Sequence, residues 1–133
     1  MARLAKARAT VICQQAGRVL LVRKAEAKWT LPGGKIEANE GPVEAALREL
    51  CEETGLASEA LEYLALHQFD SRAHHVFRLS VPAALDARPL NEIADCRWFA
   101  PEDVDLSPVK RPSLKLLKLY CSVSDIGTAS TNR

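Results

Sequence analysis

The first apolar runs of the chain predict a β-hairpin. Ala9 to Cys13 and Arg18 to Arg23 are short, β-rich segments, and the residues between them, Gln14-Gln15-Ala16-Gly17, are typical of a turn closed through glycine. The second run is apolar nearly throughout, which indicates a strand covered on both faces. The chain therefore opens with two strands, the second of them inside a layered structure.

The stretch between Pro42 and Gly55 predicts a helix with two contrasting faces. Proline suits a first helical position, and glycine suits a left-handed stop. Projection at about 100° per residue places five residues in one apolar arc: Val43, Leu47, Leu50, Cys51 and Thr54. Glu49, Glu52 and Glu53 fall together on the opposite side, where each like-charged pair costs a few tenths of a kcal/mol.

This acidic edge has two interpretations. Three glutamates on an amphipathic helix, taken alone, are most often a solvated face. The alternative is a cation site, since clustered carboxylate oxygens are the ligands that Mg²⁺ or Mn²⁺ prefers, particularly where substrate phosphates complete the shell. The residues around the glutamates decide between the two.

The run that contains these glutamates resembles the signature of the Nudix hydrolases. That signature is a glycine, five residues, a glutamate, seven residues and then Arg-Glu-Leu-x-Glu-Glu-x-Gly-Leu, and this chain fills every specified position: Gly34, Glu40, Arg48, Glu49, Leu50, Glu52, Glu53, Gly55 and Leu56. Such a match is far more specific than a lone glycine-rich loop. The resemblance implies an α/β fold, the Nudix fold, which is an α/β/α sandwich around a mixed β-sheet.

The resemblance also implies a metal-dependent cleavage of a nucleoside diphosphate linked to a moiety X. The implied ligands of Mg²⁺ (or Mn²⁺) are the Gly33 carbonyl and the carboxylates of Glu49, Glu52 and Glu53. Three residues are implied to be structural members of the site: Gly34, Glu40 and Arg48, with Arg48 holding the loop through Glu40. A tight turn is the alternative interpretation of Gly33.

The signature supplies no nucleophilic side chain, so we expect water to attack directly, with a glutamate as the general base. The candidates are Glu52, Glu53 and Glu92. Asp95 is the alternative to Glu92 as the acidic residue of the loop. Lys24, and second Arg23, are expected to contact substrate phosphate, as a basic residue does here in MutT-type relatives. Solvated surface charges are the alternative for Glu92, Lys24 and Arg23.

Alternation of apolar and polar residues predicts two further strands, Leu61 to Phe69 and His74 to Val81. His74 and His75 fall on opposite faces of a regular strand. We favour a solvated strand end for these histidines, with a position beside a substrate cleft as the alternative.

The last third of the chain predicts a short aromatic strand, at the end of Asn91 to Phe99, and a closing helix. Ser107 or Ser113 suits the cap of that helix, which runs to about Tyr120. The residues expected to pack inward are Leu114, Leu117 and Tyr120 or Cys121. We interpret its basic outer side as a solvated face rather than a nucleic-acid patch.

Length and composition fit one globular domain, and we expect residues 1–124 to form it and residues 125–133 to fray. A net charge of +1 predicts no general attraction to nucleic acid or anionic membranes. No run approaches the length of a membrane span, so we expect neither secretion nor insertion. Four widely spaced cysteines predict reduced thiols and a cytoplasmic protein, with a disulfide framework as the weaker alternative.

The substrate is the least determined part of the prediction. The chain has no four-cysteine zinc module, and Asp70 to Arg72 show neither the proline associated with ADP-ribose hydrolases nor the tyrosine associated with dinucleoside-polyphosphate hydrolases. A nucleoside triphosphate, oxidised or otherwise non-standard, is the leading expectation, with nucleoside monophosphate and pyrophosphate as products. The alternatives are an ADP-ribose or nucleotide-sugar pyrophosphatase and a nucleotide-binding regulator without activity. The family includes monomers and dimers, so a homodimer stays open.

Overall fold

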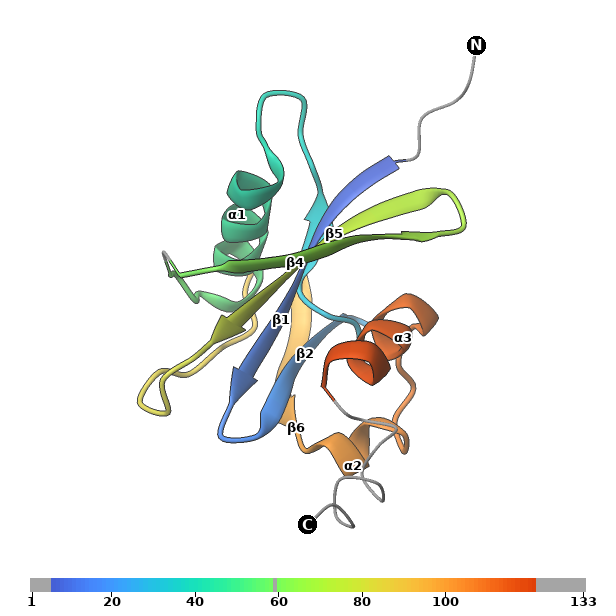
Figure 1. Cartoon of the computed structure of the whole chain (residues 1–133). Coiled ribbons are helices and arrows are strands. Elements are labelled where there is room, and N and C mark those ends of the chain that lie inside the picture. The colour runs from blue at the N-terminus through green and yellow to red at the C-terminus, as the bar shows by residue number, and fades with distance from the viewer. Residues whose placement is uncertain (1–5, 59, 122–133) are drawn as a thin grey trace, which may run out of the picture.

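A computed structural model describes residues 6–58 and 60–121, which fold as a mixed β-sheet with helices on both faces (Figure 1). This arrangement confirms the predicted α/β sandwich. The elements of the described residues, in chain order, are β1 (Lys6–Gln15), β2 (Arg18–Lys24), β3 (Gly33–Lys35), α1 (Pro42–Thr54), β4 (Glu62–Phe69), β5 (Arg72–Ser80), β6 (Ile93–Phe99), α2 (Pro101–Val104) and α3 (Arg111–Tyr120). The tail predicted at residues 125–133 lies outside the described residues.

The strands are ordered β4-β5-β1-β2-β6, and β3 pairs with β1 beside this path. β1 runs parallel to β5 from Lys6 to Gln14, and the other pairings between these strands are antiparallel. One edge of β1 is shared, because β3 pairs with Arg8 to Thr10 and β2 pairs with Gln14 and Gln15. The short strand β3 therefore leads directly from the middle of the sheet into α1.

Each face of the sheet carries its own hydrophobic core. Ile12, Val19 and Leu21 pack with Leu116 and Leu117 of α3, whereas side chains of the opposite alternation pack on the α1 side: Ala9, Val11, Cys13 and Leu20 with Ala45, Ala46 and Leu50. Neighbouring residues of β2 contribute to both cores, which confirms that this strand is covered on both faces. Two layers of helix thus enclose the sheet.

Helix α1 begins and ends as predicted, at Pro42 and before Gly55, whose φ of 78° is left-handed. The predicted packing face is wrong in part, because Val43 is 50% exposed and Cys51 is also exposed. The helix packs instead through Ala45, Ala46, Leu50 and Thr54. Alanine adds little to a hydrophobic projection, but its small side chain lets the helix lie close to the sheet and sets which side is buried.

The closing helix differs from the prediction at its start. Lys110 occupies the N-cap position without a side-chain hydrogen bond, and Ser113 lies inside the helix. The Ser113 hydroxyl instead accepts the Leu31 N–H at 2.9 Å and bonds the Thr30 hydroxyl. Leu116 and Leu117 are the buried leucines, while Leu114 packs at the margin of the core. The serine therefore joins α3 to the chain before β3 and does not cap the helix.

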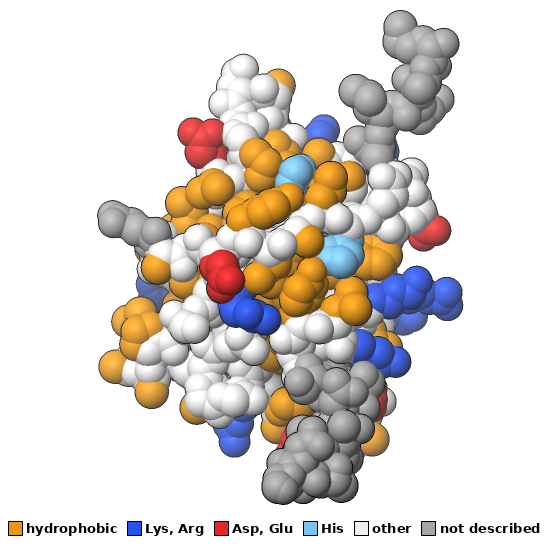
Figure 2. Space-filling model, viewed as in Figure 1, with side chains coloured by type: hydrophobic (Ala, Val, Ile, Leu, Met, Phe, Trp, Pro, Cys, Tyr) orange, Lys and Arg blue, Asp and Glu red, His pale blue; other side chains and the backbone are white. Residues whose placement is uncertain are grey.

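Figure 2 shows hydrophobic side chains gathered over β4 and the neighbouring strand, where β4 forms an edge of the sheet. Two large ones, Tyr63 and Leu66, are exposed. No helix in the described residues is both long enough and apolar enough to cross a membrane.

Candidate active site

A cleft of about 1080 Å³ opens beside the side of α1 that carries the glutamates. Its walls come from β1, β3 and β5, from the start of α3, and from the segments that follow β2 and precede β6. All three glutamates predicted from the helix, Glu49, Glu52 and Glu53, line it together with Gly33 and Gly34.

The two glycines are required by how closely β3 approaches its neighbours. Gly33 has a φ of 149°, and a Cβ there would overlap the backbone carbonyl of Ala9. A Cβ on Gly34 would overlap the carboxylate of Glu49. The absence of side chains therefore lets the strand pair with β1 and lets one glutamate lie directly against its backbone.

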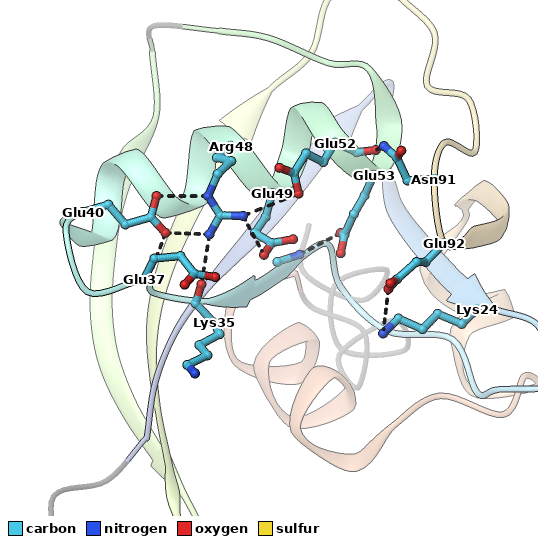
Figure 3. A network of polar contacts seen from close by, with 11 residues as sticks. Lys24, Lys35, Glu37, Glu40, Arg48, Glu49, Glu52, Glu53, Asn91 and Glu92 are labelled. Atoms are coloured by element: carbon cyan, nitrogen blue, oxygen red, sulfur yellow. Dashed lines mark hydrogen bonds and ion pairs between the residues drawn. The ribbon is translucent and has the colours of Figure 1, made fainter.

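Two of the glutamates are held inside the cleft. Glu53 Oε1 accepts the Gly33 N–H at 3.0 Å, and burial raises the pKa of this carboxyl to about 7 despite that hydrogen bond (Figure 3). Glu49 has a side chain only 16% exposed, and burial raises its pKa as well. Glu52 is 52% exposed. The acidic edge is thus a graded series from buried to solvated and not a uniformly solvated face.

Arg48 connects the loop before α1 to these carboxylates. Its guanidinium donates two hydrogen bonds to Glu40, at 2.5 and 3.0 Å, and a third to the Lys35 carbonyl at 3.1 Å. Its Nη1 also contacts Glu49 Oε2 at 3.1 Å and Glu52 Oε1 at 3.5 Å (Figure 3). These hydrogen bonds lower the pKa of Glu40 and raise that of Arg48. The predicted contact between Arg48 and Glu40 is therefore present.

The carboxylates face the same cleft without converging on one point. Among residues 6–58 and 60–121, no three His, Cys, Asp or Glu side chains gather closely enough to form a ready metal site. The reason lies in the hydrogen bonds, since Arg48 draws Glu49 and Glu52 toward itself while Glu53 bonds Gly33. The oxygen-only donor set nevertheless suits a hard divalent cation.

The loop before β6 closes the C-terminal end of α1. The Asn91 amide donates to the Glu52 carbonyl at 2.7 Å, and the Leu90 and Arg88 N–H groups donate to the Glu53 and Thr54 carbonyls. Helix ends leave such carbonyls without partners inside the helix. The loop therefore caps the helix and brings Glu92 to the cleft, where Glu92 pairs with Lys24 at 3.4 Å (Figure 3).

The two predicted cations of β2 separate. Lys24 lines the cleft, whereas Arg23 is not among the lining residues. The Arg23 guanidinium lies 4.6 Å from the centre of the Trp29 ring and 3.9 Å from Asp95. Asp95 also pairs with Arg97, outside the cleft lining. Successive residues of a strand point to opposite faces, which accounts for the difference.

The cleft residues that sequence reasoning missed include Arg8, Arg72 and Thr10. It also favoured a solvated position for His74, which is wrong, because His74 is buried and its Nδ1 lies 2.9 Å from the Thr10 hydroxyl. Burial, reinforced by Arg8 and Arg72, lowers the pKa of His74 to about 4. The parallel pairing of β1 with β5 brings these residues together. A local sequence pattern does not predict such a pairing between distant strands.

Comparison with known proteins agrees with this geometry. The model of the NUDIX domain matches residues 3–120. The chain belongs to the Nudix hydrolase family. As a Nudix hydrolase it is an enzyme that acts on phosphoanhydride bonds.

Individual relatives support the family assignment. Phosphatase NudJ from Escherichia coli is 31% identical over 110 residues, which cover 74% of this chain and 72% of NudJ. A Nudix hydrolase family member from Chromobacterium violaceum has a similar structure, with a TM-score of 0.78, 30% identity and coverage of 92% of this chain and 79% of the other.

A third comparison shows the fold alone. The Nudix domain of Shewanella oneidensis NrtR, solved with ADP-ribose, has a TM-score of 0.76 at 19% identity, over 88% of this chain and 86% of the other. In this Nudix chain the signature run spans β3, the following loop and α1, so that Gly34 at its start and Glu53 near its end both line the cleft.

Proposed function

We propose that the chain is a Mg²⁺- or Mn²⁺-dependent pyrophosphohydrolase that cleaves a nucleoside diphosphate linked to a moiety X. The observation that carries the proposal is the acidic edge of α1, which lines a cleft beside the Gly33–Gly34 backbone. The preferred substrate is a nucleoside triphosphate, including an oxidised or non-standard one, and the products are a nucleoside monophosphate and pyrophosphate. An ADP-ribose or nucleotide-sugar pyrophosphatase is the alternative.

The residues that would hold the cation are Glu49, Glu52 and Glu53, with the Gly33 carbonyl. The cleft fits such an ion because the carboxylate of Glu49 occupies the space that a side chain on Gly34 would fill, and because burial disfavours the charged form of Glu53 until a positive partner is present. When bound there, a divalent cation neutralises charge on the diphosphate and makes water more acidic.

The remaining roles belong to the chain's own side chains. A helix glutamate, Glu52 or Glu53, serves as general base with Glu92 as helper, and the raised pKa of Glu53 suits a group that exchanges a proton near neutral pH. Arg48, held by Glu40, orients the carboxylates of Glu49 and Glu52. Lys24 lines the cleft, which supports its proposed contact with phosphate. For Arg23 that role stays a prediction.

Replacement of Glu53 by glutamine tests the site assignment. Glu53→Gln removes a charge from the cleft while its amide oxygen can still accept the Gly33 N–H, so the fold should persist. We expect Mg²⁺-dependent turnover to fall by at least about a hundredfold. The measurement is release of phosphate and pyrophosphate across nucleoside triphosphates, nucleotide sugars, ADP-ribose and dinucleoside polyphosphates.

Glu62→Gln is the matched control, because Glu62 is an exposed carboxylate on β4 outside the cleft. It makes the same change in net charge and should turn over substrate at the parental rate. A Glu53→Gln variant as active as this control would show that the site is assigned wrongly.

The cysteines support a reducing compartment. Cys13, Cys51, Cys96 and Cys121 are all free thiols, and burial raises the pKa of Cys13 to about 12 and that of Cys121 to about 11. Free thiols, among them the buried Cys13 and Cys121, are typical of cytosolic proteins. We therefore infer a cytoplasmic protein.

A homodimer stays a prediction, which light scattering on the purified chain would test.

A further inference from the structure

Basic side chains line the cleft across from the glutamates of α1. Arg8 comes from the start of β1 and Arg72 from the start of β5, and the parallel register places His74 beside Arg8. Arg8 and Thr10 lie two residues apart on β1 and so share a face, as do Arg72 and His74 on β5. The bond between Thr10 and His74 fixes the two strands side by side at this point.

These two arginines differ from Arg48 in their ion pairs. Within the described residues no carboxylate lies within ion-pair distance of Arg8 or Arg72, whereas Arg48 contacts three. Arg8 is half-buried, and its pKa is lowered by burial and by the charge of Arg72, whereas the charges of Glu49 and Glu53 oppose this shift. Arg72 is exposed and Arg8 is half-buried, so an anion that contacts both guanidinium groups would replace water around Arg8 and oppose the repulsion between the two charges. A guanidinium group can donate two parallel hydrogen bonds to the oxygens of one phosphate.

The cleft therefore holds the carboxylates of α1, with Arg48 among them, in one part of its lining and the guanidinium groups of Arg8 and Arg72 in another. Thr10 pairs with Gly33, whose N–H donates to Glu53. Arg8 lies two residues before Thr10 on β1 and pairs with Lys35. Two residues of a strand span about 7 Å. This separation suits a metal-bound substrate. Its cation would lie against the glutamates of α1, and its remaining phosphate oxygens would extend along β1.

We propose that Arg8 and Arg72 form an anion subsite for the phosphate oxygens of X, so that the enzyme prefers substrates in which X is negatively charged. A nucleoside triphosphate meets this requirement, because its X is a phosphate. ADP-ribose and nucleotide sugars do not, because their X is a neutral sugar. The inference rests on the proposed function for the identity of the ligand, but the subsite itself can be tested without catalysis.

Binding of inorganic pyrophosphate in EDTA, measured by isothermal titration calorimetry, tests the subsite alone. Arg8→Gln and Arg72→Gln should each raise the Kd at least about tenfold, since each removes charged hydrogen bonds to the anion. Arg18→Gln is the matched control, an exposed arginine at the hairpin end of the sheet, and should bind as the parent does. An unchanged Kd in both cleft variants would overturn the proposal.

Substrate selection is the second readout. With Mg²⁺, Arg8→Gln and Arg72→Gln should lower kcat/KM for a nucleoside triphosphate at least about tenfold and leave that for ADP-ribose within about twofold. Arg8→Lys keeps the charge, so it should recover part of the loss and serves where Arg8→Gln fails to fold. Equal losses on both substrates, or a parent that prefers ADP-ribose, would overturn the inference. Arginine-dependent pyrophosphate binding in a parent without any hydrolysis would instead reject the proposed function and keep the subsite.

Discussion

Two neighbouring glycines of the cleft should respond differently to the same substitution. The atoms nearest to a Cβ on Gly34 would belong to the far end of the flexible Glu49 side chain, so Gly34→Ala should keep the fold and displace that carboxylate. We expect hydrolysis to fall about a hundredfold, because small misplacements of a catalytic group are that costly. The free energy of unfolding should change by less than about 1 kcal/mol, the cost of a shifted rotamer. Urea unfolding and steady-state kinetics measure the two effects.

Gly33→Ala supplies the contrast. Its Cβ would meet the backbone of Ala9 at a φ that favours glycine, and backbone cannot move aside without breaking the pairing of β3 with β1. This variant should lose more than about 2 kcal/mol of stability. If Gly34→Ala instead retained parental turnover, Glu49 would not be needed where the structure places it.

At the scale of elements, the loop before β6 acts as the cap of α1. Asn91 has a φ of 54° and donates to the Glu52 carbonyl, so Asn91→Gly removes the donor without adding backbone strain. We expect a loss of about 1 kcal/mol in the free energy of unfolding, typical of one hydrogen bond. Asn91→Ala should lose roughly 1 kcal/mol more, since alanine disfavours the left-handed conformation. Urea unfolding resolves both, and an Asn91→Gly variant as stable as the parent would show that the amide does not stabilise the helix end.

The elements also show what the sequence could predict. The bounds of α1 depend on Pro42 and Gly55, which act locally, and the structure confirms them. The three-residue β3 and the four-residue α2 are too short to leave a periodic pattern. Arg8 and Arg72 were not predicted as site residues, because they come together through a pairing between strands more than sixty residues apart. The glutamates of α1 were thus predicted from one continuous run, whereas Arg8 and Arg72 required the fold.

At the scale of the whole molecule, the fold brings two groups with opposite pKa shifts to one cleft, the partly buried Glu53 of α1 and the buried His74 of β5. Burial raises the pKa of Glu53 from 4.5 to about 7, so the stabilisation of its neutral form is present below pH 4.5 and is lost as pH rises through 7. Burial lowers the pKa of His74 from 6.5 to about 4, so its contribution is present above pH 6.5 and is lost as pH falls through 4. The two dependences oppose each other between pH 4.5 and 6.5 and flatten the stability profile of the parent.

Removing one group should therefore reveal the other. In Glu53→Gln, measured in EDTA, the free energy of unfolding should fall as pH is lowered from 6.5 to 4, because the unfolded chain takes up a proton that the buried His74 does not. The slope is at most about 1.4 kcal/mol per pH unit for one proton. Adding His74→Gln should flatten this profile, since glutamine does not titrate. Urea unfolding at intervals of pH measures both proteins. Should the double variant keep the slope of the single one, another group would carry the proton, and His74 would not be held neutral by the fold.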